Sequence, residues 1–540
     1  MLRTTRPQRA ALAALTVGAL LLTSCADDPD EDASDNETPG SDEPDEEEPT
    51  EPELTAGGSD LVPAIDATVN GKGVTDDEIK IVYNLTLEAC GNDPATAAAY
   101  VVTDQYQETI DVLVGWFNEN VEFPGGRTLS LEYVNDGGPN AGCEDTAREA
   151  GLRTASEIEA FASLGNSTNF GGTSVYAETT TGNGTIQIGG STFQTAKDLT
   201  DRWPYAFSVY QIAEAALEQL AWYIGARETD TTYVAADGTE SPRVWGTLFF
   251  DDTQGHALAD LVIPMLADRG VEATPYFVSG DAAQAGQAAT SLAAQMREDG
   301  VNSVVLGVHG VPGSAVMLAF DAQEYFPDHF VSDFGAFMGL ALFNTALYGQ
   351  QTNRFLGVGS PSPASLRVDI NLDGSSTVST DLTGTGPTLP EIAYAQAGGP
   401  LPNPTVGAPL GGFWLELSTL AMGIMNAGET LNAFTFAEGL TSASTCQIER
   451  FYGRDQVQTP LFGYTAEQPW GHHGFTTAYW TTEVNTIDQP GYFESYDGYQ
   501  RFLTEGDLPP EPSYDTGEAG DYPTDGALDG PKGDPAQACS

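Results

Sequence analysis

Short apolar runs and longer amphipathic stretches alternate along this chain from about residue 74 onward. The runs Ile79 to Leu85 and Leu129 to Val134 have the length and composition of buried strands. Between them, apolar residues recur at helical spacing, at Val102, Tyr106, Ile110, Leu113, Val114 and Phe117. The pattern therefore predicts a strand, a helix and a second strand, in that order.

The same alternation returns later in the chain, at intervals of about thirty residues. The strands predicted there are Trp245 to Phe250, Val271 to Val278, Ser303 to Val308 and Phe330 to Asp333. A helical pattern at Leu258, Leu261, Val262, Met265 and Leu266 separates the first two and ends before Gly270. Strands joined by crossover helices predict parallel sheets covered on both faces, which is the α/β class.

About 430 residues of ordinary apolar content lie between the polar ends of the chain, and this is more than one core usually organises. We therefore expect two doubly wound parallel-sheet lobes. The net charge of −58 leaves no basic patch that could neutralise phosphates, so nucleic acid is excluded as a partner.

The N-terminus has the parts of a bacterial lipoprotein signal, namely a basic start, an apolar run and small residues before a cysteine. These parts are Arg3, Arg6 and Arg9, then Ala10 to Leu22, then Leu22-Thr23-Ser24-Cys25. The apolar run is too short to span the ~30 Å hydrocarbon core. We expect residues 1–24 to be removed as a signal peptide and Cys25 to carry a lipid anchor at the outer face of a membrane. In the alternative, the signal peptide is cut elsewhere and Cys25 is incidental.

Residues 25–73 are predicted to form a disordered acidic linker. From Asp27 to Glu53 the chain is nearly all Asp, Glu, Pro, Ser and Thr, so it cannot bury enough apolar surface to offset the entropy of ordering. The ~35 residues from Ala26 to Asp60 could reach on the order of 100 Å at ~3.3 Å per residue. Residues 506–540 have similar chemistry and are predicted to form an irregular tail.

The remaining cysteines fit an oxidising compartment, since no CxxC or His/Cys cluster suggests a metal. They are Cys90, Cys143, Cys446 and Cys539. Cys90 and Cys143 each follow one of the first two predicted strands. If those strands are parallel neighbours, both cysteines emerge at the same edge and could form a disulfide worth roughly 4 kcal/mol. Cys446 and Cys539 would then pair by elimination.

Five segments in this order resemble the type I periplasmic-binding-protein superfamily, specifically the branched-chain amino-acid-binding (Leu/Ile/Val-type) receptors of ABC transporters. They are Val74 to Ile81, Ala162 to Thr168, Ile188 to Thr192, Trp203 to Phe207 and Gly246 to Asp252. The resemblance implies two doubly wound lobes, joined by a hinge of several strands, that close over a small ligand. It maps residues 74–208 and 408–450 to the first lobe and residues 209–360 and 451–503 to the second. Residues 361–407 have no counterpart and are predicted to be an insertion.

Polar residues follow two predicted strands of the first lobe, where doubly wound sheets bind ligands. Beyond the carboxyl ends of such strands, helix N-termini offer free N–H groups to anions. Asn166, Ser167 and Thr168 occupy one such position, and Ser191 and Thr192 occupy another. Their hydroxyl groups add donors, and the resemblance places carboxylate-binding positions close by. Ordinary helix capping would also explain these residues, and the two roles can coexist.

On the second lobe, the resemblance implies ligand-facing positions near Gln254, His309 and Asp333. An acid there would meet an ammonium group. Members of the family often carry Tyr where this chain has His309, and a structural role in the cleft wall is an alternative for that residue. The acidic position falls on Asp333 or Phe334, depending on the alignment. An amino-acid ligand fits, but the sequence does not identify the solute.

The sequence contains no GxSxG, Walker A or HExxH motif, so hydrolase, nucleotide and zinc-protease functions lack their usual residues. His472 and His473 are adjacent, and in a strand they would point to opposite faces, so we expect no shared metal. Asp369 to Gly374 begins like a calcium loop, but Thr380 stands where the loop needs Glu. A hairpin turning at Asp373-Gly374 is expected instead. No catalytic residue, metal or cofactor is predicted.

These features predict a lipid-anchored extracytoplasmic receptor. It would capture a small polar solute by lobe closure and deliver it to the permease of an ABC transporter. The alternative function is a sensory receptor ectodomain of the same fold, which signals ligand occupancy to a partner.

Overall fold

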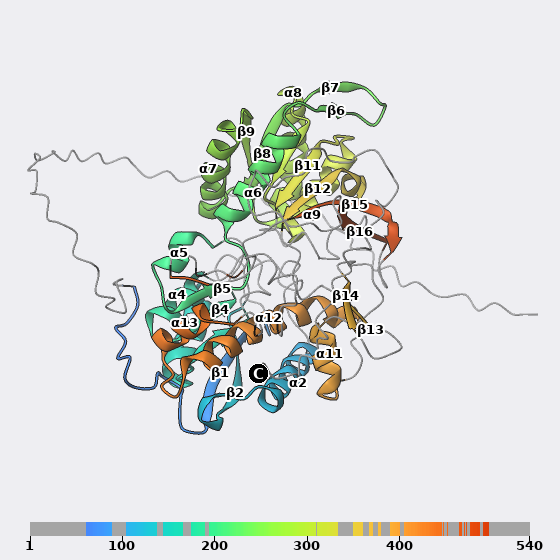
Figure 1. Ribbon diagram of the computed structural model, residues 1–540. Helices are drawn as coiled ribbons and strands as arrows, with labels where there is room; N and C mark the ends of the chain where they lie inside the picture. The colour runs from blue at the N-terminus through green and yellow to red at the C-terminus, as the bar shows by residue number, and fades with distance from the viewer. Residues whose placement is uncertain are drawn as a thin grey trace, which may run out of the picture. The chain divides into compact units, whose positions relative to one another are not determined.

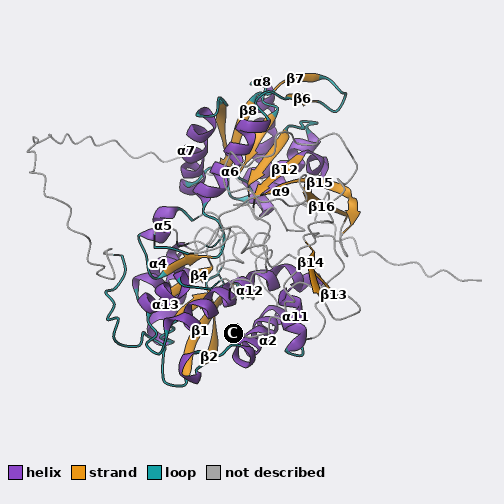
Figure 2. Cartoon of the chain, viewed as in Figure 1, coloured by secondary structure: helices purple, strands orange, loops and turns teal. Residues whose placement is uncertain are grey.

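Two β-sheets, each with its own covering helices, organise the chain in the computed structural model (Figure 1). The structure describes residues 61–88, 104–137, 144–165, 174–189, 194–308, 310–332, 349–359, 367–370, 376–379, 389–399, 404–444, 447, 451, 464–466, 469, 471, 476–485 and 490–495. In both lobes the strands lie among helices, as Figure 2 shows by type of element.

The first sheet has five parallel strands in the order β2-β1-β3-β4-β5. Its strands are β1 (Glu78–Leu85), β2 (Thr128–Asn135), β3 (Ala162–Leu164), β4 (Ile186–Gly189) and β5 (Ala206–Ser208). Its helices are α2 (Asp104–Asn120), α3 (Glu144–Leu152), α4 (Ser174–Gly182), α5 (Ala196–Thr200), α11 (Leu389–Gln396), α12 (Pro404–Ala427) and α13 (Ala433–Thr441), with short helical turns at Pro124–Gly126 and Arg153–Glu157. The strand–helix–strand unit predicted from the first apolar runs is confirmed as β1, α2 and β2.

Successive residues of β1 enter two different cores, because side chains alternate across a strand. Ile79, Ile81 and Tyr83 pack with residues of α2, α12 and α13, whereas Val82 packs with residues of α3 and α4. Helices therefore cover both faces of the first sheet, and the doubly wound prediction is confirmed for this lobe.

Helix α12 packs beside α2, although their sequences lie far apart. The ring of Trp414 lies 5.3 Å from that of Trp116, measured between centroids. Trp414 Nε1 donates a hydrogen bond to the backbone oxygen of Phe451 at 2.7 Å, and Trp116 Nε1 donates to Gln396 Oε1 at 3.0 Å. These partners satisfy both indole N–H groups inside the core.

The second sheet has the order β16-β15-β12-β11-β10-β8-β9. Its strands are β8 (Trp245–Phe250), β9 (Ala273–Val278), β10 (Ser303–Leu306), β11 (Asp328–Ser332), β12 (Phe355–Gly359), β15 (Thr476–Asn485) and β16 (Pro490–Ser495). Its helices are α6 (Ala213–Arg227), α7 (Thr253–Ala267), α8 (Ala282–Glu298) and α9 (Gly310–Ala322), with a 3₁₀ turn at Gly349–Arg354. The strands predicted in this half of the chain are confirmed as β8 to β11.

Helices also cover both faces of the second sheet. Val304 and Leu306 of β10 pack with residues of α8 and α9, while Val305 packs with residues of α6 and α7. Strands β8 to β12 are parallel, but β15 is antiparallel to β12 and β16 to β15. The prediction of parallel sheets thus holds for the doubly wound part, and a hairpin extends the sheet on one side.

Residues 61–73 pack on the first lobe, although the sequence analysis assigned residues 25–73 to a disordered linker. Val62 and Ile65 contact the first core. Lys72 Nζ donates to the backbone oxygen of Ala155 at 2.8 Å, and the backbone N–H of Gly71 donates to the backbone oxygen of Leu431 at 2.7 Å. Unlike the stretch from residue 27 to 53, this segment has apolar side chains to bury, which is why it docks.

Several residues from the predicted insertion and from the predicted second lobe pack in the first core. Ala393 and Tyr394 of α11 belong to that core, as do Phe451 and Tyr464. These side chains pack around α2 and α12, so this part of the chain contributes to the first lobe before it reaches β15. The lobe boundaries inferred from the resemblance are displaced here, because local sequence does not show which core an aromatic side chain enters.

Within residues 361–407, β13 (Arg367–Ile370) pairs with β14 (Ser376–Ser379) in antiparallel fashion. Ile370 lies opposite Ser376, so the chain reverses between them, as expected for a hairpin at Asp373-Gly374. The turn residues themselves lie outside the described part of the chain.

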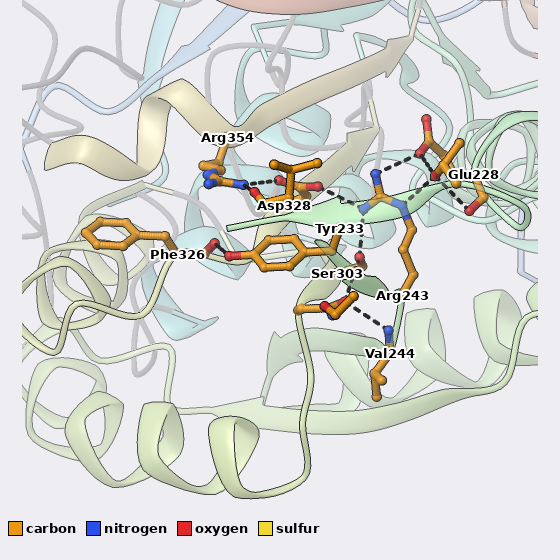
Figure 3. Close-up of polar contacts among 12 residues, drawn as sticks. Glu228, Tyr233, Arg243, Val244, Ser303, Phe326, Asp328 and Arg354 are labelled. Carbon is orange, nitrogen blue, oxygen red and sulfur yellow. Dashed lines mark hydrogen bonds and ion pairs between the residues drawn. The ribbon is translucent and has the colours of Figure 1, made fainter. Parts of the chain in front are cut away.

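A network of ion pairs joins the residues on either side of the hairpin of β6 (Thr232–Val234) and β7 (Glu240–Pro242) to the second sheet (Figure 3). Arg243 Nη2 lies 2.9 Å from Glu228 Oε2, and Arg243 Nη1 lies 2.8 Å from Asp328 Oδ2. Arg354 Nη1 lies 2.9 Å from the other oxygen of Asp328. Asp328 begins β11, so the network lies at the amino end of the strands, opposite the edge where ligands are expected.

No helix among the described residues is long and apolar enough to cross a membrane.

Candidate ligand-binding site

The first sheet has a topological switch point between β1 and β3. Strand β2 lies on one side of β1, and β3, β4 and β5 lie on the other. Connections therefore leave in opposite directions, and the crevice outside the carboxyl ends of β1 and β3 is where doubly wound sheets bind ligands. The register places Tyr83 beside Leu164, so Asn84 and Gly165 follow at this edge.

A fully buried carboxylate lies at this switch point. Glu416 of α12 has no exposed surface, and its Oε2 accepts the backbone N–H of Gly165 at 3.1 Å. The buried Tyr83 hydroxyl donates to the backbone oxygen of Phe413 at 3.3 Å. Burial, followed by the charge and hydrogen bond of Glu416, raises the pKa of Tyr83 well above its usual value. The phenol therefore stays protonated and remains a hydrogen-bond donor.

A second buried acid holds the end of β1 against the end of β2. Asp136 accepts hydrogen bonds from Asn84 Nδ2 at 2.9 Å and from Thr86 Oγ1 at 3.4 Å. Asn135 Oδ1 accepts the backbone N–H of Leu87 at 3.0 Å. The chain that leaves β1 is therefore fixed to the end of β2.

This contact bears on the predicted disulfide between Cys90 and Cys143. Strands β1 and β2 are parallel neighbours over their whole length, as the prediction required. The four cysteines Cys90, Cys143, Cys446 and Cys539, and the lipidation candidate Cys25, lie outside the described residues, so both disulfides stay predictions.

The predicted ligand residues of the first lobe follow two neighbouring strands. Strands β3 and β4 are parallel partners. Gly165 directly follows β3 and Gly189 is the last residue of β4; their φ values of +105° and +143° favour glycine. Asn166, Ser167, Thr168, Ser191 and Thr192 come next in sequence and lie outside the described residues. The strands nevertheless end at the same edge of the sheet.

The second sheet repeats the strand order of the first. Along the parallel part the order is β9-β8-β10-β11-β12, which places a switch point between β8 and β10. Gln254 follows β8, His309 follows β10 and Asp333 follows β11. Of these three predicted residues the structure describes Gln254, while His309 and Asp333 lie outside the described part.

Gln254 is positioned by the sharp turn between β8 and α7. Asp252 caps the helix, since its side chain accepts the backbone N–H of Gly255 at 2.7 Å. Only glycine fits at position 255, because a Cβ there would lie 2.0 Å from the backbone oxygen of Phe250. Gln254 is thereby held exposed in the first turn of α7, beside the partial positive charge of a helix N-terminus.

The sequence analysis did not single out Glu416, Tyr83, Asn84 or Asp136. One signal was available for Glu416, because it is the only charged residue in the sequence from Pro404 to Ala427. A lone acid in an apolar helix requires a polar partner, but the sequence does not say which one. Among the described residues, no group of His, Cys, Asp and Glu could hold a metal ion.

No protein-family model and no curated protein matches this chain. Several solved structures, however, match this chain. A leucine-, isoleucine-, valine-, threonine- and alanine-binding protein from Brucella ovis matches with a TM-score of 0.52 at 13% identity, over 80% of this chain and 97% of that one. An ABC transporter solute-binding protein from R. palustris in complex with 4-hydroxybenzoate matches with a TM-score of 0.51 at 9% identity, over 80% and 98%. A type 1 periplasmic binding protein from Bordetella pertussis Tohama I matches with a TM-score of 0.50 at 15% identity, over 78% and 100%.

These similarities span nearly the whole length of each solved chain. The chain has the two-lobed α/β fold of type I periplasmic binding proteins. The fold and the resemblance predicted from the sequence are therefore confirmed at the level of architecture, whereas the solute has to be argued from the site.

Proposed function

We propose that this chain is an extracytoplasmic solute-binding lipoprotein that captures a small polar solute between its two lobes and delivers it to an ABC permease. The solute class is an amino acid or a related amide or carboxylate. One observation carries the proposal: both sheets have the same strand order, and residues with ligand-binding chemistry follow the strands at both switch points. Capture and release of a solute need no catalytic group, so we propose no enzymatic activity.

The similar solved proteins support a small-solute ligand. The Brucella ovis protein is described as binding five amino acids, and the R. palustris protein holds 4-hydroxybenzoate. Amino acids and hydroxybenzoates share a carboxylate, which suits the backbone N–H and hydroxyl donors expected after β3 and β4.

The proposed ligand residues are Asn166, Ser167, Thr168, Ser191 and Thr192 on the first lobe and Gln254, His309 and Asp333 on the second. The first set would bind an anionic group of the solute. Asp333 would bind an ammonium group, where one is present, through a charge-assisted hydrogen bond.

The proposal predicts that a true ligand stabilises the protein. At a hundred times its dissociation constant, a solute that binds only the folded state adds about 2.7 kcal/mol to the free energy of unfolding. A thermal-shift screen of amino acids, amides, short peptides and organic acids measures this. Replacing Thr192→Val removes one donor and should weaken the ligand found by about 5- to 150-fold.

The melting temperature of the ligand-free variant is the control in that experiment. If Thr192 only caps a helix, Thr192→Val lowers this temperature and leaves affinity nearly unchanged. A screen in which no solute shifts the wild-type melting temperature would remove the main support for solute binding.

A second prediction concerns the anchor. Replacement of Cys25→Ser removes the thiol that would receive a diacylglycerol chain, so the variant should lose lipid labelling and leave the membrane fraction. Ligand binding by the lobes should be unchanged. Fractionation of cells that express each form measures this, and equal membrane retention of the two forms would contradict the lipoprotein assignment.

A further inference from the structure

Glu416 stands out among the buried acids because it joins a distant helix to the candidate ligand-binding edge. It lies 251 residues from Gly165 in sequence, yet its Oε2 accepts the Gly165 backbone N–H at 3.1 Å. Its side chain has no exposed surface. Burying a carboxyl group is costly unless hydrogen bonds compensate for the lost hydration, so the contact with Gly165 is part of what stabilises the Glu416 side chain in this place.

Gly165 is held from two sides. Its φ of +105° is one that residues with a side chain rarely adopt. A Cβ at this position would lie 2.2 Å from the backbone oxygen of Asn84, so the chain after β3 passes directly against the end of β1. The carboxylate of Glu416 fixes the N–H of the same residue. Gly165 is also the residue that precedes the proposed ligand residues 166–168.

Tyr83 supports the carboxylate from β1. Its side chain is fully buried, and the raised pKa of its hydroxyl reflects burial first and then the charge and hydrogen bond of Glu416. The Tyr83 hydroxyl donates to the backbone oxygen of Phe413, three residues before Glu416 in α12, so β1 is joined to the same stretch of helix. Helix α12, β1 and the chain after β3 therefore meet at Glu416.

We propose that Glu416 is a positioning residue, whose side-chain oxygen fixes Gly165 at the carboxyl end of β3 and so holds the end of this strand in the geometry that ligand binding requires. The side-chain oxygen accepts a backbone N–H at the edge where ligand anions usually bind. A fixed strand end matters because a site that must be ordered on binding has a lower affinity. The expected effect on ligand affinity rests on the proposed function, whereas the contact between Glu416 and Gly165 can be tested without a ligand.

The experiment compares two substitutions in the full chain. Glu416→Gln keeps a side-chain oxygen of the same reach that can accept the Gly165 N–H, and Glu416→Leu removes every acceptor at nearly the same volume. Hydrogen–deuterium exchange mass spectrometry, with overlapping peptides that isolate the Gly165 amide, gives the first readout. Glu416→Leu should speed exchange at Gly165 by about tenfold or more, and Glu416→Gln should restore most of the protection.

Two further variants make the comparison specific. Glu228→Gln removes a buried carboxylate from the second lobe, where Glu228 is 1% exposed, and should leave exchange at Gly165 unchanged. Tyr83→Phe removes the phenol beside Glu416 and should speed exchange at Gly165 by about two- to fivefold, less than Glu416→Leu. Tyr83→Phe keeps the test decisive if Glu416→Leu does not fold.

The second readout is affinity, titrated with L-valine and 4-hydroxybenzoate as probes. Glu416→Leu should weaken a probe that binds the wild type by about tenfold, and Glu416→Gln should recover most of the affinity. Unchanged exchange at Gly165 in both Glu416→Leu and Tyr83→Phe would overturn the proposal. Faster exchange with unchanged affinity would also overturn it, because the contact would then be structural only. If neither probe binds the wild type, the proposed solute class loses support, and the exchange result alone decides the role of Glu416.

Discussion

Replacement of Arg243→Met should cost roughly 3–5 kcal/mol of the free energy of unfolding, because it removes one partner of a buried ion pair. Glu228 is 1% exposed and Arg243 is 10% exposed. The guanidinium also donates to Thr231 Oγ1 and Ser303 Oγ, both at 2.8 Å, as Figure 3 shows in part. Methionine fills much of the same space but leaves the carboxylate of Glu228 buried without its arginine. Urea denaturation of the full chain measures the change.

Arg354 offers a matched control, because it binds the same Asp328 from a more exposed position. Asp328 is 23% exposed and Arg354 19% exposed, so Arg354→Met should cost only about 1 kcal/mol. The double variant Arg243→Met with Glu228→Gln should recover part of the loss, because no unpaired charge is then buried. An Arg243→Met protein as stable as the Arg354→Met protein would show that the buried pair adds nothing beyond a surface pair.

The protein should lose about 2 kcal/mol of its free energy of unfolding between pH 7 and pH 5 through one buried histidine, His329. Its ring has no exposed surface, stacks on Phe355 at 4.8 Å between centroids and lies 2.9 Å from Gln351 Oε1 through Nε2. Gln351 Nε2 donates to the backbone oxygen of Tyr325, so its Oε1 accepts and His329 Nε2 carries a proton. Burial lowers the pKa of His329 from 6.5 to about 4.

The direction of the pH effect follows from this lowered pKa. Between pH 6.5 and about 4 the unfolded chain binds a proton at this residue and the folded protein does not, so acid favours unfolding. The stabilisation is fully present above pH 6.5 and is lost as the pH falls towards 4. The variant His329→Phe cannot titrate there, so its free energy of unfolding should fall less steeply between pH 7 and pH 5. Equal slopes for the two proteins, measured by urea denaturation across this range, would contradict the assignment.

Local sequence can show those parts of the candidate site that depend on a short stretch of chain. Gln254 follows an apolar run that is β8 in the structure, and Asp252 and Gly255 form the capped turn that holds it. Capping and close approach involve neighbouring residues, so local sequence can show them. Glu416 was missed because its partner, Gly165, lies 251 residues away, and no local pattern encodes such a pair.

By itself the sequence determined the alternation of strands and helices and the α/β class, because hydrophobic periodicity shows which faces of each element are buried. It also predicted two lobes, because the body of the chain is longer than one core usually organises. It did not determine which strands are neighbours. The shared order of the two sheets, and therefore their switch points, exists only once the strands have paired. The same holds for the antiparallel pair β15 and β16, the docking of residues 61–73, and the entry of Phe451 and Tyr464 into the first core. An apolar residue in the sequence indicates a buried position, but only the tertiary structure decides which residues its side chain packs against.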